Sequence, residues 1–237
     1  MKTIADLKQR LEALPTRRKE IEHEDKYAQF LDKTAAAKEK IDQVFIALPL
    51  VDSVLPTPSY KEARTKLNRA ARSAAGIAQK LKKDAALISD SSVDKSFGAL
   101  GENATNSLSV LTSSWKTQVH NKVKDWEVIA GVISKIVEGN DESAIKTQAK
   151  RLQSAIDALH LAKSKLPQTG ASAAKVKAEI DVLTDSVAKL DLDTPFGQFL
   201  QASAAPDGAA LDLLANEDVS EAIKKHKLEK VFRVRVT

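Results

Sequence analysis

The sequence feature that most constrains the fold is an uninterrupted series of apolar residues between Phe97 and Ile136. The series places an apolar residue at every helical turn, in steps of three or four, and its first part repeats every 11 residues. Its members are Phe97, Leu100, Ala104, Leu108, Leu111, Trp115, Val119, Val123, Trp126, Ile129 or Ala130, Ile133 and Ile136. The series predicts one helix of about 45 residues, about 65 Å long at 1.5 Å per residue. Such a length is typical of a rod-like bundle or coiled coil.

The rest of the chain favours the same fold class. The 237 residues are only 4% aromatic and include 8 glycines and 7 prolines, a composition typical of long helices. Heptad-like apolar spacing occurs on both sides of a short loop near Gly170, which predicts an antiparallel αα-hairpin over residues 141–191. We therefore predict an all-α fold, an elongated helical bundle or coiled coil with long antiparallel helices.

Composition shifts divide the chain into two predicted parts. Residues 1–193 form the helical body, in which a proline-rich connector at 49–58 ends one helix at about Leu48. Ser59 with Glu62 predicts a capping box for the next helix, which runs to about Ile88. Residues 194–237 form a small helical module with a capped helix from Asp218, its cap completed by Glu221, and a strand at 230–236.

That terminal strand alternates apolar and basic residues, the pattern of a half-buried strand. Phe232, Val234 and Val236 fall on one face, and Arg233 and Arg235 fall on the other. The strand has three candidate mates: another segment of this chain, a second copy, or the edge of a partner's sheet. We favour addition to a partner's sheet, which makes these five residues the predicted partner-binding site. A helical or disordered tail is the simpler alternative.

The charge of the chain is concentrated in one predicted helix. Between Tyr60 and Lys83 there are eight basic residues and one acidic residue, a net charge of +7, although the whole chain carries +5. Five of the basic residues share one helix face opposite the apolar face, and we call them the basic face. They are Lys61, Arg69, Arg72, Lys80 and Lys83. Because no aromatic residues lie among them, the pattern predicts contact with duplex phosphates rather than stacking on single-stranded bases.

Three other interpretations of the basic face stay open. It is a solvated helix face, or it pairs with the acidic run Glu20–Asp25 on a neighbouring helix, or the amphipathic helix lies on an anionic membrane. The mostly alanine apolar face, without an aromatic anchor, disfavours the membrane.

The sequence favours no catalytic residue, metal or cofactor. There is no cysteine, and no phosphate-binding or dinucleotide-binding glycine motif. Glu20 and His23 have the spacing of a di-iron ligand pair, but the second pair and the inward-facing carboxylates that such a site needs are missing. The tryptophans Trp115 and Trp126 fit core positions better than a ligand site. We therefore predict a protein that is not an enzyme, with an enzyme lacking a recognisable motif as the alternative.

The longest apolar windows, near Val44 and Val128, are too short to span a membrane, and no signal peptide is apparent, so we expect a cytoplasmic protein. The pattern is similar to that of helical accessory subunits in bacterial complexes, without a motif that identifies a family. We predict a non-enzymatic structural or interaction subunit of a larger assembly, which docks on protein partners through its helical seams and C-terminal strand. The alternative is a nucleic-acid-binding accessory protein that uses the basic face; self-association stays open.

Overall fold

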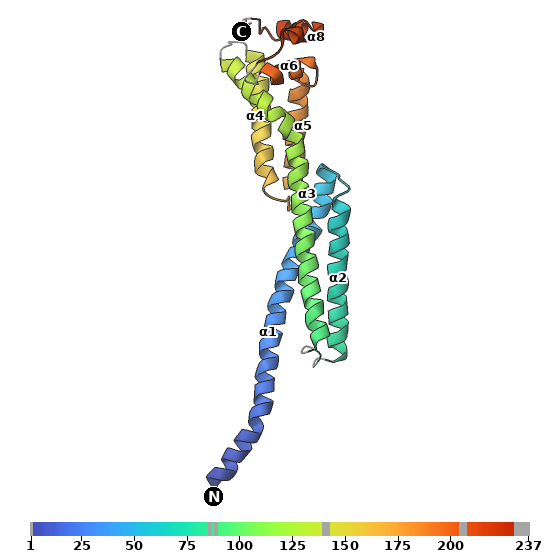
Figure 1. The fold of residues 1–237 in the computed structure, drawn as a ribbon, viewed down its shortest axis with the longest axis vertical. Helices are drawn as coiled ribbons and strands as arrows, with labels where there is room; N and C mark the ends of the chain where they lie inside the picture. The colour runs from blue at the N-terminus through green and yellow to red at the C-terminus, as the bar shows by residue number, and fades with distance from the viewer. Residues whose placement is uncertain (1, 85–86, 88–89, 139–142, 204–207, 230–237) are drawn as a thin grey trace. The chain divides into compact units, whose positions relative to one another are not determined.

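The computed structural model describes residues 2–84, 87, 90–138, 143–203 and 208–229, and the side chains of residues 2–23, 135–138, 143–145 and 211 lie outside that description. The described residues form eight helices and no strand, which confirms the predicted all-α fold (Figure 1). The strand predicted at 230–236 lies outside the described residues. None of the helices in the described part of the chain has the length and apolar character needed to cross a lipid bilayer.

The chain divides into two compact units. The first contains Met1–Pro49 and Thr57–Ser113, and the second contains Leu50–Pro56 and Ser114–Thr237. The division falls within helices α1 (Lys2–Val54) and α3 (Ser91–Glu138), so each of these helices contributes to both units. The boundary predicted near Asp193 lies inside the second unit.

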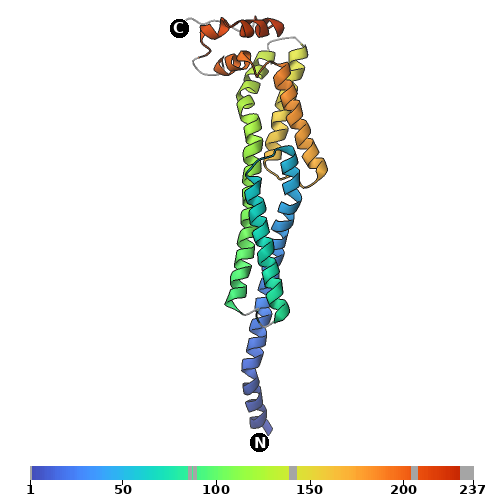
Figure 2. The same ribbon diagram turned by 90° about the vertical axis from the view of Figure 1, so that its right-hand side faces the viewer.

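In the first unit, α1, α2 (Tyr60–Lys83) and the first part of α3 run side by side (Figure 1, Figure 2). One apolar cluster joins them, with Phe30 from α1, Ile77 from α2 and Phe97 from α3 among its buried members. The rings of Phe30 and Phe97 stack with centroids 4.2 Å apart and planes 9° from parallel. Ser107 of α3, also buried, donates a hydrogen bond of 2.8 Å to the carbonyl oxygen of Ala63 in α2. The unit is a three-helix bundle with a continuous core.

The helix ends in this unit differ from the predictions. The predicted end of the first helix at about Leu48 is wrong, because α1 continues through Pro49 to Val54. The predicted capping box is also wrong: Ser59 has helical backbone angles, φ −59° and ψ −25°, and its side chain makes no capping hydrogen bond. The helix predicted to reach Ile88 ends at Lys83, since Asp84 is extended.

The long helix predicted from the apolar series is confirmed as α3, a helix of 48 residues. The series supplies buried side chains along most of its length, and the prediction that Trp115 belongs to the core is also confirmed, with 0% of that residue exposed. Trp126 is half-buried. The Trp115 indole Nε1 donates a hydrogen bond of 3.0 Å to the carbonyl oxygen of Ala162, within the last turn of α4 (Ser143–Lys163).

The second unit contains α4, α5 (Gly170–Lys189), α6 (Pro195–Ser203), α7 (Leu211–Leu214) and α8 (Glu217–Lys225). Helices α4 and α5 pack on each other across a short loop, and α8 packs on α6 and α7. Thr169 caps α5 in a reciprocal pair of hydrogen bonds with Ser172, a capping box that the sequence analysis missed. The cap predicted from Asp218 and Glu221 is wrong, because Asn216 is the N-cap of α8 and accepts from the Asp218 backbone N–H.

Gly197 is required by a close approach in this unit. A Cβ atom at this position would lie 1.9 Å from the carbonyl oxygen of Leu192, a residue that is itself buried. The first turn of α6 can therefore pack against the Leu192 backbone only with glycine at position 197.

We expect Phe97→Ala to lower the free energy of unfolding of the first unit by about 3–5 kcal/mol, because it removes a buried, stacked ring and leaves a cavity. The matched substitution Phe45→Ala truncates a side chain of a residue that is 72% exposed. It should change the free energy of unfolding by less than about 0.5 kcal/mol. Urea denaturation followed by far-ultraviolet circular dichroism measures both. Equal effects of the two substitutions would contradict the described core.

Candidate nucleic-acid interface

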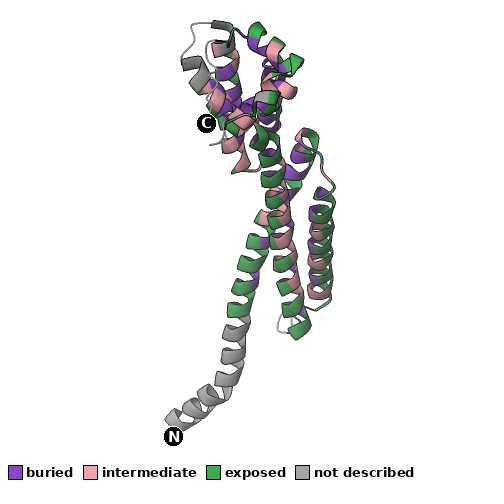
Figure 3. Ribbon diagram, turned by 45° about the horizontal axis from the view of Figure 1, so that its top comes forward, coloured by how far each residue is buried: buried purple, intermediate pink, exposed green. Residues whose placement is uncertain are grey.

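The five residues of the basic face all lie on α2, and the structure places four of them in solvent. Lys61, Arg69, Arg72 and Lys83 are exposed. Lys80 is half-buried, and its Nζ lies 3.0 Å from the Ser92 hydroxyl oxygen at the start of α3. Figure 3 shows the exposed residues of α2 in green. All five sequence-predicted cations are therefore on one element, and four are available to a ligand.

The helical period explains why the cations share a face. Lys61, Arg72 and Lys83 recur every 11 residues, close to three full turns, so they form a line nearly parallel to the helix axis. The apolar positions Ala70 and Ile77 lie on the opposite side and are buried against α1 and α3. Packing of the apolar face thus fixes which side of α2 meets solvent.

No carboxylate forms an ion pair with the basic face in the described part of the chain. The ion pair that α2 does form joins Lys66, outside the basic face, to Glu62 at 3.7 Å. Lys80 also attracts the Asp90 carboxylate, whose pKa lies below the usual range because the Ser92 hydroxyl and backbone N–H donate hydrogen bonds to it, with attraction from Lys80 adding to them. The face keeps a concentrated positive charge.

One of the alternative interpretations loses support. The membrane interpretation needs the apolar side of α2 to be exposed, but Ala63 and Ala70 are 0% exposed and Ile77 only 5%. Within the acidic run, Glu24 and Asp25 are exposed, and neither forms an ion pair with the basic face among the described residues. The other two acidic side chains of the run lie outside the description, so pairing with this run is not tested. A solvated face, pairing with the acidic run and a polyanion-binding face remain.

Other predicted positions are not tested by the structure. Phe232, Arg233, Val234, Arg235 and Val236 lie outside the described residues. The side chains of Glu20 and His23 also lie outside the description. Among the described residues, no group of three or more histidine, aspartate or glutamate side chains could hold a metal ion.

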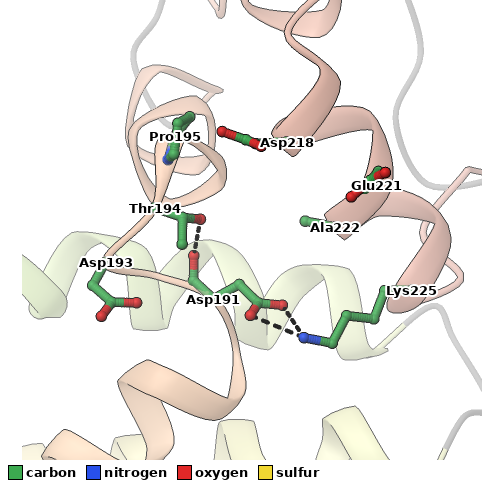
Figure 4. A pocket seen from close by; sticks show the side chains of 8 residues that line it. All are labelled: Asp191, Asp193, Thr194, Pro195, Asp218, Glu221, Ala222 and Lys225. Carbon is green, nitrogen blue, oxygen red and sulfur yellow. Dashed lines mark hydrogen bonds and ion pairs between the residues drawn. The ribbon is translucent and has the colours of Figure 1, made fainter.

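The second unit contains a polar cluster that the sequence pattern does not predict (Figure 4). The Asp191 carboxylate accepts hydrogen bonds of 2.9 and 2.7 Å from Lys225 Nζ and lies 2.8 Å from His226 Nε2. His226 is 9% exposed, and its ring stacks on Phe196 with centroids 5.8 Å apart. These contacts hold the loop after α5 against the end of α8. No local pattern predicts them, because the partners are 34 and 35 residues apart.

A hollow of about 670 Å³ adjoins this cluster. It is lined by Asp191, Asp193, Thr194, Pro195, Asp218, Glu221, Ala222 and Lys225. The Thr194 hydroxyl donates to the backbone oxygen of Asp191, and the Asp191 carboxylate is engaged by Lys225 and His226. These contacts hold the loop after α5 and α8 together.

The electrostatics of Asp191 have a measurable consequence. Partial burial raises the pKa of its carboxyl, but hydrogen bonds from Lys225 and then His226 outweigh burial, so the pKa lies below its usual value. A pKa that is lower in the folded than in the unfolded state stabilises the fold above the unfolded value. That stabilisation is lost as the pH falls through the folded pKa.

We expect Asp191→Asn to lower the free energy of unfolding by about 1–2 kcal/mol at neutral pH. Asparagine keeps the backbone, since it tolerates the left-handed conformation that Asp191 adopts at φ 54°. The difference from the unsubstituted protein should begin to shrink below about pH 4, where the Asp191 carboxyl of the unfolded chain takes up a proton, and should disappear as the pH falls through the lower pKa of the folded state. Urea denaturation at neutral and acidic pH measures it, and a difference that does not vary with pH would contradict a charge-based contact.

No family of known proteins matches this sequence, and no curated protein or solved structure is significantly similar to it.

Proposed function

We propose that this protein is a non-enzymatic interaction subunit of a larger assembly and that it holds duplex nucleic acid against the basic face of α2. The observation that carries the proposal is the solvent exposure of the basic face and its lack of ion pairs. Four are exposed, and none of the five is paired with a carboxylate in the described part of the chain. If these cations contacted a polyanion, they would release the counterions condensed on the polyanion, and no ion pair within the protein would have to break first.

The dimensions of the basic face suit a duplex. From Lys61 to Lys83 the helix rises about 33 Å at 1.5 Å per residue. One turn of B-form DNA is about 34 Å long, so the ends of the face span about one turn. Side chains in a nearly straight line on a stable helix contact a stiff duplex at several points without reshaping either partner.

The aromatic content of α2 disfavours a single-stranded ligand. Tyr60 is the one aromatic residue of this helix, and it is 3% exposed. Proteins that hold single strands without sequence preference stack bases on exposed aromatic rings. Arginine and lysine contacts with phosphate need no such rings, so the exposed groups of α2 favour backbone contact with a duplex.

A separate observation supports the protein-assembly part of the proposal. Large apolar side chains are exposed on α1: Tyr27 at 57%, Leu31 at 53% and Phe45 at 72%. Aromatic side chains are enriched at protein interfaces. The docking role predicted for the C-terminal strand remains a prediction, because residues 230–237 lie outside the described residues.

We expect reversal of four cations, by Arg69→Glu, Arg72→Glu, Lys80→Glu and Lys83→Glu together, to abolish duplex binding in a mobility-shift assay. For the unsubstituted protein, phosphate contacts from the four exposed cations correspond to a slope of about −3.6 in the logarithm of the binding constant against the logarithm of salt concentration. Absence of measurable binding by the unsubstituted protein at about 50 mM salt would refute the proposal, since low salt favours such complexes.

A control with the same change in net charge separates a specific face from general attraction. Lys116, Lys122, Lys124 and Lys150 are exposed outside the basic face, and their combined reversal to glutamate should leave most of the affinity intact. Equal loss in both variants would show that the duplex responds to net charge rather than to α2. Circular dichroism spectra should be unchanged in both, because the replaced side chains lie outside the apolar core.

A further inference from the structure

An apolar groove lies at the loop end of the α4–α5 hairpin, far along the chain from the basic face. Its volume is about 460 Å³, and its walls come from the last turns of α4, the connecting loop and the first turns of α5. Val176 is buried in one wall, and Leu166 is half-buried in the loop. Leu161, which also borders the groove, is 76% exposed, the highest exposure among the large apolar residues described. The surface therefore carries both a hollow and a projecting apolar side chain.

Hydrogen bonds fix the walls of the groove. The Trp115 indole donates to the Ala162 carbonyl oxygen at 3.0 Å, which ties the last turn of α4 to α3. At the other wall, Thr169 and Ser172 exchange capping hydrogen bonds at the start of α5. A groove held in this way is pre-organised, so a ligand does not have to meet the entropic cost of ordering it.

The charges at the groove are of both signs. Lys175 and Glu179, one turn apart on α5, both border it, as does Lys165. None of the three forms an ion pair in the described part of the chain. If α5 of a second molecule packed antiparallel about a two-fold axis near position 177, Lys175 of each copy would face Glu179 of the other. A two-fold interface requires a surface that is complementary to itself. This surface has an apolar groove beside the projecting Leu161 side chain, and it has Lys175 beside Glu179.

We propose that this groove is the contact surface of a homodimer, in which two α4–α5 hairpins pack across a two-fold axis. Leu161 of each copy enters the apolar surface of the other, and Lys175 and Glu179 set the antiparallel register. The inference does not depend on nucleic-acid binding, because the groove belongs to the second unit and the basic face to the first.

The test is the mass of the full-length protein by sedimentation equilibrium over a range of concentrations reaching about 200 μM, so that even a weak dimer with a dissociation constant of about 200 μM is populated. We expect a monomer–dimer equilibrium. Leu161→Asp should abolish the dimer, whereas the matched change Val128→Asp, at an exposed apolar residue on α3, should leave it intact. A protein that is monomeric throughout the range would overturn the proposal, and so would a dimer that survives Leu161→Asp.

A charge exchange tests the register. Lys175→Glu alone and Glu179→Lys alone each place like charges opposite each other twice in the dimer, and each should weaken association about tenfold. The double exchange restores opposite charges across the axis and should recover the original dissociation constant. Additive losses in the double variant would contradict the antiparallel arrangement. Circular dichroism checks that each variant keeps its helical content, so that loss of the dimer is not mistaken for unfolding.

Discussion

The fold depends on one constraint, the continuous apolar stripe of α3. A helix of 48 residues is not stable in water by itself unless one face is buried along its length. The stripe supplies Phe97 and Ala104 to the core of the first unit and Trp115 and Val119 to the core of the second. The outward side of α2 and the position of the end of α4 both follow from packing on this stripe.

The same packing converts a sequence pattern into a charged surface. Helix α2 is held by small side chains, with Ala63 and Ala70 completely buried, and its cations are left on the opposite side. Concentrating a net charge of +7 on one helix produces self-repulsion, which salt screens and which a polyanion would relieve. The fold of the first unit and its proposed ligand are therefore linked through the same charges.

The sequence was sufficient for features that depend on periodicity. The 11-residue recurrence predicted the long helix, and the charge pattern predicted the residues of the basic face. Helix ends were less predictable, because tertiary packing competes with local signals. Pro49 removes one backbone hydrogen-bond donor, yet Leu48 and Val51 beside it are buried, and that packing keeps the helix intact. Contacts between distant segments, such as Asp191 with His226, leave no local signal. Whether a cation of the basic face forms an ion pair likewise depends on which side chains α1 and α3 place nearby.

The two tryptophans have a practical consequence for experiments on this protein. Trp115 and Trp126 are the only tryptophans of the chain, and both belong to the second unit, while the two tyrosines, Tyr27 and Tyr60, belong to the first. Excitation at the red edge of the absorption band therefore reports selectively on the second unit. The emission of Trp115, buried and hydrogen-bonded, should shift to longer wavelength when that unit opens, whereas helical dichroism records the whole chain. The protein thus carries a built-in spectroscopic label for asking whether its two units unfold together or in turn.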